Sequence, residues 1–186
     1  MILNNNLMRK INIFITVNIV LMFLHQVSFS QLANDYYDNG LKKYNNENYT
    51  DAIQDFQKAL DLVTKSDVSY NQIYLDSYNR IGLCYYELHK YETALKYLDK
   101  VIGLDSTFAG FYFNRALVYG EMENNIGAID DYTNAIKFKP DYAFAYANRG
   151  IIYLNLGHRE EACQDFKKAL DLGDNEIKSH YKKYCK

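Results

Sequence analysis

The sequence predicts an all-α fold, a solenoid built from tandem helix-turn-helix hairpins. Three observations predict it: one set of aromatic and small residues returns every 34 residues, its members are spaced at helical intervals, and the 186-residue chain holds a single proline. Because proline is costly inside a helix, a lone proline suits a chain made almost entirely of helices. A hydrophobic content of 48% and a charged content of 24% are ordinary for a folded domain.

The recurring set is an aromatic, a small residue, a second aromatic, an alanine, an aromatic or leucine, and a final alanine or valine. Its last three copies are Tyr146, Gly150, Tyr153, Ala162, Phe166 and Ala169; Tyr112, Ala116, Tyr119, Ala128, Tyr132 and Ala135; and Tyr78, Gly82, Tyr85, Ala94, Leu98 and Val101. An incomplete first copy is Tyr36, Gly40, Ala52, Phe56 and Ala59. Spacings of three and four residues place each half of a copy on one helix face, so each copy predicts two helices.

The small residues indicate where the two helices of a hairpin come closest, because close packing needs small side chains at the contact. Glycine inside a helix costs about 1 kcal/mol relative to alanine, which a close approach would offset. A single hairpin leaves an apolar face uncovered, so successive hairpins are expected to stack. The expected closest contacts are Gly82 with Ala94, Ala116 with Ala128, and Gly150 with Ala162.

This 34-residue pattern resembles the tetratricopeptide repeat over about residues 33–176. The resemblance implies a right-handed α-solenoid whose concave inner face binds a protein or peptide. It places repeats at about 33–66, 75–108, 109–142 and 143–176, followed by a capping helix at about 176–185. Pro140 lies between the third and fourth repeats, where this family often has proline.

The first thirty residues differ from the repeats. Two basic residues, a short apolar run and a pair of small residues follow one another: Arg9 and Lys10, Ile11 to Leu24, then Ser28 and Ser30. This order is typical of a signal peptide, so we expect cleavage after Ser30 and a periplasmic or extracellular mature domain of residues 31–186. The alternative is an uncleaved membrane anchor, which the run disfavours because it is shorter than the ~20 residues of a transmembrane helix.

Residues 67–74, after the first repeat, have no counterpart in the other repeats. Ser66 or Asp67 suits a helix N-cap and the following residues are periodic, so we expect them to extend the first helix of the second repeat. Past Glu176 the chain is too short for another repeat and is expected to form one helix that covers the last hairpin.

The charge balance argues against nucleic acid as a partner. The chain has 21 basic and 23 acidic residues, and loss of the first thirty would remove only basic charge. Phosphate binding needs a basic stripe, which this composition does not supply. The expected partner is a protein or peptide; no small-molecule substrate is evident, and a membrane is expected only if the N-terminal segment is retained.

No residue pattern for catalysis or metal binding is present. The histidines are scattered, with His89 and His158 in predicted turns, and the sequence has no HExxH, no CxxC and no glycine-rich phosphate loop. Adjacent acidic residues such as Asp130 and Asp131 do not face each other on a helix. We therefore expect no enzymatic activity, no cofactor and no metal site.

An arginine precedes the small residue in the third and fourth repeats, where an apolar residue is most common in the family. In the same repeats an aspartate precedes the second-helix aromatic, whereas both positions are uncharged in the second repeat. This favours structural ion pairs between the two helices of a hairpin; the alternative is that the arginines contact a bound peptide. The expected pairs are Arg115 with Asp131 and Arg149 with Asp165.

The resemblance also implies which first-helix positions line the concave groove. The candidate groove residues are Tyr37, Asn79, Arg80, Leu83, Phe113, Asn114, Leu117, Phe144, Asn148 and Ile151. Chaperone-tail binders of the family carry a lysine and asparagine clamp for a terminal carboxylate; because Tyr37 and Leu41 stand at the matching positions, this clamp is absent. Asparagine and arginine flanked by apolar side chains suit an extended peptide. The alternative is that these residues are only the walls of a solenoid.

Two of the three cysteines are expected to form a disulfide. Cys163 lies ten residues before Gly173 and Cys185 lies ten residues after Asn175. If the last helix runs back antiparallel to the preceding one, a rise of 1.5 Å per helical residue places both cysteines at about the same distance from the turn, where they can face each other. Export would place the pair in an oxidising compartment. We expect Cys84 to be a packed, reduced thiol; the alternative is three free thiols.

The sequence therefore favours an exported, non-catalytic scaffold that binds another protein or an extended peptide through its concave groove. The alternative is a structural component that self-assembles in an envelope complex.

Overall fold

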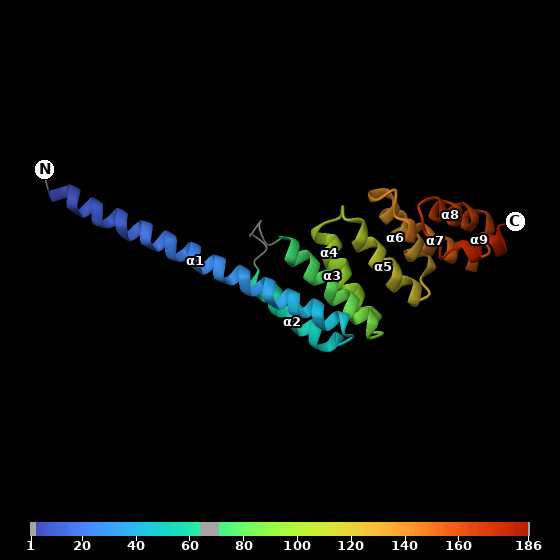
Figure 1. The fold of residues 1–186 in the computed structure, drawn as a ribbon, viewed down its shortest axis with the longest axis horizontal. Coiled ribbons are helices and arrows are strands. Elements are labelled where there is room, and N and C mark those ends of the chain that lie inside the picture. The colour runs from blue at the N-terminus through green and yellow to red at the C-terminus, as the bar shows by residue number, and fades with distance from the viewer. Residues whose placement is uncertain (1–2, 64–70, 186) are drawn as a thin grey trace. The chain divides into compact units, whose positions relative to one another are not determined.

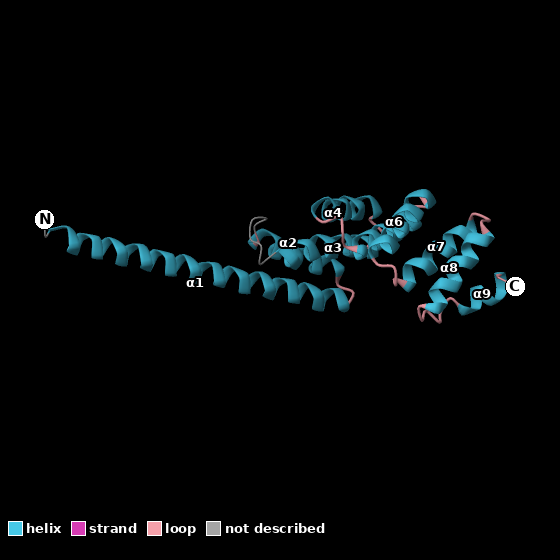
Figure 2. Cartoon of the chain, turned by 90° about the horizontal axis from the view of Figure 1, so that it is seen from above, coloured by secondary structure: helices cyan, strands magenta, loops and turns pink. Residues whose placement is uncertain are grey.

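The computed structural model describes residues 3–63 and 71–185, apart from the side chains of residues 3–8, 11, 12, 21–30 and 71. All regular structure within these ranges is α-helical, and they contain no strand (Figure 2). The all-α fold predicted from the sequence is confirmed. The chain divides into two compact units, Met1–Ser77 and Tyr78–Lys186.

The first unit contains a hairpin of α1 (Leu3–Asn45) and α2 (Tyr49–Leu62) (Figure 1). The side chain of Asn48 accepts a hydrogen bond from the backbone N–H of Asp51 and thereby caps the start of α2. Helix α1 continues without a break through Ser30, so the expected cleavage site lies inside a helix of the full-length chain. Among the described residues, no helix combines the length and the apolar character needed to cross a membrane.

A glycine sets the packing of this first hairpin. A Cβ atom on Gly40 would lie 2.6 Å from the ring of Phe56, which is fully buried. The ring therefore occupies space that any other residue at position 40 would need for its side chain. Tyr37 packs against the same ring at a centroid distance of 5.6 Å.

Helix α3 (Asn71–Glu87) begins in the first unit and continues into the second. The segment expected to extend this helix is helical from Asn71 onward. The two candidate N-caps, Ser66 and Asp67, lie outside the described residues together with the rest of residues 64–70.

The second unit continues with pairs of helices and a short final helix. Its elements after α3 are α4 (Tyr91–Leu104), α5 (Ala109–Glu121), α6 (Asn125–Phe138), α7 (Ala143–Asn155), α8 (Arg159–Asp171) and α9 (Lys178–Tyr184). Helix α5 packs on α6 and α7 packs on α8, while α4 contacts α5 and α6 contacts α7 (Figure 1). The hairpins of this unit therefore stack in chain order.

The helix glycines approach the backbone of the expected alanines, but the atoms nearest to them belong to larger side chains. A Cβ on Gly150 would lie 3.2 Å from the carbonyl oxygen of Ala162, the expected partner, and 2.6 Å from the Phe166 ring. At Gly82 the nearest atom belongs to the side chain of Leu98, at 2.8 Å. Each glycine thus makes room chiefly for the large residue one turn after the alanine.

The chain reverses direction between α8 and α9. Gly173 has a φ of 96°, a left-handed conformation that favours glycine. After the reversal, buried Ile177 joins Phe166 and Ala169 in one apolar cluster, against which Tyr181 also packs. Helix α9 therefore covers the apolar end of the last hairpin.

Candidate binding surface

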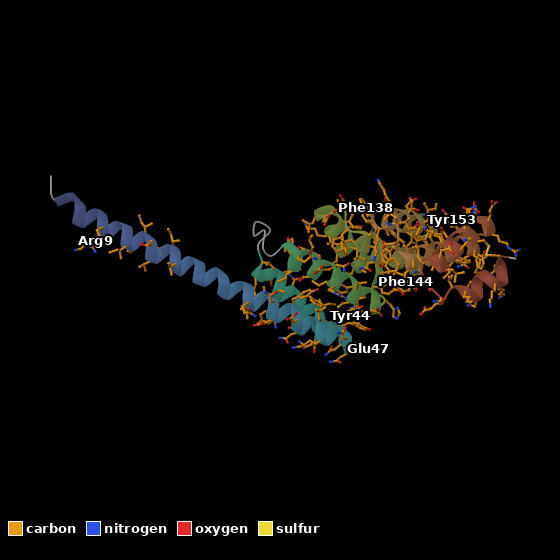
Figure 3. The ribbon with its side chains drawn as sticks, turned by 45° about the horizontal axis from the view of Figure 1, so that its top comes forward. Arg9, Tyr44, Glu47, Phe138, Phe144 and Tyr153 are labelled. Carbon is orange, nitrogen blue, oxygen red and sulfur yellow. A yellow bond between two sulfur atoms is a disulfide. The ribbon has the colours of Figure 1, made fainter. Side chains whose placement is uncertain are left out.

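Nine of the ten candidate groove residues lie in the second unit. They are Asn79, Arg80 and Leu83 on α3, Phe113, Asn114 and Leu117 on α5, and Phe144, Asn148 and Ile151 on α7, and we call these nine the inner row. Phe144, labelled in Figure 3, is 54% exposed, and the other eight are half-buried. Tyr37, the tenth, lies on α1 in the first unit.

A hydrogen bond joins the inner row across neighbouring hairpins. The Nδ2 atom of Asn114 donates to Oδ1 of Asn79 over 2.8 Å, although the two residues are 35 positions apart. Asn148 does not continue this link, because its Nδ2 donates to the carbonyl oxygen of Phe144, one turn earlier in α7. A side-chain amide has two N–H donors and an acceptor oxygen, so one such bond leaves capacity for a ligand.

The inner row is supported from behind by aromatic packing. The ring of Phe113 stacks on Tyr142 at a centroid distance of 4.8 Å and meets Tyr132 edge-on at 5.6 Å. Burial raises the pKa of both tyrosine hydroxyls, so they remain neutral at physiological pH. Leu117 packs against the buried apolar cluster that contains Tyr132. The surface therefore rests on a packed core.

The two expected ion pairs are present in the second unit. Nε and Nη2 of Arg115 donate to the two carboxylate oxygens of Asp131 at 2.7 and 2.8 Å, and Arg149 binds both oxygens of Asp165 at 2.8 Å. Both aspartates are buried. The hydrogen bonds that the two arginines donate to these aspartates raise the pKa of both guanidinium groups. This geometry supports the structural role of the arginines over contact with a peptide.

Each arginine makes a further contact that the sequence analysis missed. Nη1 of Arg115 binds Oδ1 of Asp99 at 2.7 Å, and Nη1 of Arg149 donates to Oγ1 of Thr133 at 2.9 Å. Asp99 on α4 and Thr133 on α6 are 34 residues apart, and so occupy equivalent positions. Each arginine therefore connects its own hairpin to the preceding one.

The first unit contains a related ion pair that was also missed. Nζ of Lys43 lies 2.6 Å from Oδ2 of Asp55, and Asp55 is buried. Asp55 precedes Phe56 just as Asp131 precedes Tyr132, so its place in the repeat could have identified it. The cation, however, comes from a different position of the first helix.

Cys163 and Cys185 form the expected disulfide, with an S–S distance of 1.98 Å and a Cα–Cα distance of 5.4 Å. Beside it, Nε of Arg159 donates to the carbonyl oxygen of Tyr184, the last residue of α9. The third cysteine, Cys84, is free and fully buried. Burial raises the pKa of the Cys84 thiol to about 12, so the thiol is protonated and unreactive near neutral pH.

The histidines at the hairpin turns make local contacts. Nδ1 of His89 lies 2.8 Å from the hydroxyl of Tyr91, and Nδ1 of His158 lies 3.5 Å from Oε1 of Glu161. No group of three or more histidine, cysteine, aspartate or glutamate side chains in residues 3–63 and 71–185 is arranged to hold a metal ion.

Sequence models of the tetratricopeptide repeat match residues 30–106, 109–142 and 143–175. The TPR repeat-containing protein MJ1428 of Methanocaldococcus jannaschii is 31% identical over 147 residues, which is 74% of this chain and 23% of that protein. The chain covers 29% and 62% of two further curated relatives, and so spans less than two thirds of the length of each.

Solved structures similar to this chain include MamA and a domain of human RPAP3. MamA matches with a TM-score of 0.66 and 27% identity, over 78% of this chain and 81% of that chain. The second TPR domain of human RPAP3, solved in complex with an HSP70 peptide, matches with a TM-score of 0.56 and 31% identity. That match covers 60% of this chain and 95% of the RPAP3 chain.

Proposed function

Because the chain belongs to the tetratricopeptide repeat family, we propose that it is a non-catalytic scaffold whose inner row binds an extended segment of another protein. The hydrogen bond between Asn114 and Asn79 carries the proposal. It brings amide side chains of neighbouring hairpins together among half-buried apolar residues. Amides can bind the backbone of an extended segment, while Phe113 and Leu117 contact its side chains. The peptide complex of the related RPAP3 domain supports this class of partner.

The test is a triple substitution in the inner row, Arg80→Ala, Asn114→Ala and Asn148→Ala. We expect the variant to lose the partner that wild-type protein captures in a crosslinking pull-down, while circular dichroism shows unchanged helicity. The matched control replaces three exposed second-helix residues by alanine: Lys100, Asp130 and Lys168. Undiminished capture by the inner-row variant would place the binding surface elsewhere.

Export of this scaffold is part of the proposal. The order of basic, apolar and small residues before Gln31 supports a cleaved signal peptide, and a disulfide suits an oxidising compartment. N-terminal sequencing of the protein isolated from its producing cells should give Gln31 as the first residue. A chain that retains Arg9 and Lys10 and fractionates with membranes would instead support an uncleaved N-terminal membrane anchor.

A second candidate function is self-assembly within an envelope complex. Its supporting observation is that several large apolar side chains of the second unit reach solvent, among them Met122, Ile126 and Leu156, because exposed apolar surface favours association. Size-exclusion chromatography with light scattering on residues 31–186 separates the two candidates. A stable monomer disfavours self-assembly, and a concentration-dependent oligomer favours it.

A further inference from the structure

A pocket of about 310 Å³ lies in the second unit beside the inner row. Its walls come from the segment that enters α5, residues 107–110, and from the connection between α6 and α7, where Phe138, Lys139 and Tyr142 contribute. Phe108 and Phe138 are 52% and 39% exposed, so two large aromatic rings reach solvent here (Phe138 is labelled in Figure 3).

Three consecutive residues of α5 hold the aromatic walls in place. Each packs against one ring: Phe111 against Phe108 at 4.7 Å, Tyr112 against Phe138 at 5.5 Å, and Phe113 against Tyr142 at 4.8 Å between centroids. Phe111 and Tyr112 are buried and Phe113 is half-buried. Because packed neighbours fix its rings, the pocket is formed before any ligand arrives, which lowers the entropy cost of binding.

The α5 side of the pocket consists of the small residues Ala109 and Gly110. A Cβ atom on Gly110 would lie 2.6 Å from the Phe108 ring. Glycine at this position therefore allows the ring to stand where it does.

Two lysines lie at the pocket: Lys139 lines it and Lys137 lies beside its Phe138 wall, and we call them the rim lysines. Nζ of Lys139 lies 4.9 Å from the centroid of Tyr142, and Nζ of Lys137 lies 5.7 Å from that of Phe138. No carboxylate is among the lining residues. The nearby carboxylate of Asp105 accepts hydrogen bonds from the backbone N–H and the hydroxyl of Thr107.

The pocket is continuous with the inner row, because its Tyr142 wall stacks directly on Phe113. Gly110 lies three residues before Phe113 on α5, and so on the same helix face. A segment lying along the inner row can therefore place one side chain in the pocket.

We propose that this pocket takes a phenylalanine, tyrosine or tryptophan side chain of the extended segment bound on the inner row, and that the rim lysines bind an acidic residue adjacent to it. The inference rests on the proposed function. Aromatic rings attract one another in stacked and edge-on arrangements at centroid distances of about 4.5–7 Å, and walls of three rings offer such contacts. The lysines add charge complementarity to a carboxylate.

The test uses full-length protein and three acetylated, amidated peptides that differ at two positions: Ser-Ala-Phe-Glu-Ala-Ser, Ser-Ala-Leu-Glu-Ala-Ser and Ser-Ala-Phe-Lys-Ala-Ser. Dissociation constants are measured by titration under NMR. We expect the Phe-Glu peptide to bind about fivefold more tightly than the Leu-Glu peptide, the ratio that about 1 kcal/mol of ring contact provides. It should also bind more tightly than the Phe-Lys peptide, whose lysine is repelled by the lysines at the pocket. Phe108→Ser should remove the preference for phenylalanine over leucine, whereas the control Ile126→Ser should not.

The outcomes separate the two proposals. Asn114→Ala with Asn148→Ala should weaken the Phe-Glu and Leu-Glu peptides by the same factor if the inner row binds backbone. Equal binding of these two peptides, weakened alike by the asparagine changes, would overturn the pocket and leave the inner row supported. Absence of binding, or binding that the asparagine changes do not weaken, would overturn the inner row and with it this use of the pocket.

Discussion

Two aspartates of the second unit illustrate how individual residues are used. Asp131 is buried and receives two hydrogen bonds from Arg115, while its neighbour Asp130 is exposed. The two residues are chemically identical, so they provide a matched pair for mutation.

Asp131→Asn should lower the free energy of unfolding by about 2 kcal/mol, because a hydrogen bond to a charged group contributes roughly 1.5–3 kcal/mol and Arg115 would lose the buried one of its two carboxylate partners. Asp130→Asn should change the free energy by less than about 0.5 kcal/mol, as is usual for surface substitutions. Urea denaturation followed by circular dichroism measures both. If Asp131→Asn and Asp130→Asn unfold at the same urea concentration, the ion pair of Arg115 with Asp131 makes no net contribution to stability.

The reactivity of the cysteines is a second prediction for individual residues. Native protein at pH 8 should not react with a thiol reagent, because burial raises the pKa of Cys84 to about 12 and blocks access to it. Unfolding without reductant should release one thiol, and unfolding with reductant three. Three thiols without reductant would contradict the bridge between Cys163 and Cys185.

The Cys84 thiol also gives stability a pH dependence. In the folded chain the pKa of this thiol is about 12, so the thiol stays protonated up to about that pH. In the unfolded chain its pKa is near the ordinary value of 9.0. Its contribution to stability is therefore fully present below 9.0 and is lost as the pH rises toward 12.

Within the helices, glycines occur in two kinds of environment. A Cβ on Gly150 would collide with the buried ring of Phe166, whereas a Cβ on Gly120 of α5 would meet no atom within 4 Å. Gly150→Ala should therefore destabilise the protein by about 1–3 kcal/mol through overpacking. Gly120→Ala should stabilise it by about 0.5–1 kcal/mol, because alanine favours the helix. Thermal unfolding of both variants is the measurement, and opposite shifts in Tm are expected.

Helix α9 depends on its covalent link. It has seven residues, too few to be stable alone, and its disulfide closes a separation of 22 residues. Replacing Cys163 and Cys185 by serine should reduce stability by about 3 kcal/mol in the loop-entropy model. We expect faster amide hydrogen exchange in α9, with α5 and α6 unchanged. Cys84→Ala is the control and should leave α9 protected; unchanged α9 exchange in the double variant would contradict the prediction.

At the scale of the whole molecule, each hairpin of the second unit provides a surface for the next. Ala145 and Ile152 of α7 belong to the buried cluster built around Tyr112 and Tyr132 of the preceding hairpin. A chain ending at Tyr142 should uncover this cluster and associate, as light scattering can detect. A chain ending at Glu176 keeps α7 and α8 and should remain less associated than the shorter one.

Much of the fold could be predicted because the spacing of residues within each repeat determines which of them share a helix face. Tyr146, Gly150 and Tyr153 share a helix face through their spacing alone, and the recurrence of Arg149 with Asp165 identified a contact between helices. The packing of Gly150 on Phe166 was missed, because sequence spacing does not tell which of two residues one turn apart comes nearer.

The candidate surface could be predicted only in part. The family resemblance identified the helices that carry the inner row, but not that Asn114 would bind Asn79 while Asn148 would bind its own helix. The aromatic pocket escaped prediction because Phe108, just before α5, and Phe138, at the end of α6, are far apart in the sequence. Asp99 and Thr133 escaped because one is an acid and the other an alcohol, so no shared charge marked their common position.

The contact that each arginine makes with the preceding hairpin, Arg115 with Asp99 and Arg149 with Thr133, has a consequence for the addition of further repeats. Arg115 and Arg149 each reach one partner sixteen residues later, within their own hairpin, and one sixteen residues earlier, in the hairpin before. A duplicate of residues 109–142 inserted after Tyr142 would bring its own arginine, aspartate and threonine. Its arginine would meet the original Thr133, and its threonine would meet Arg149. Gene duplication of this module therefore creates a new junction with every polar partner already supplied.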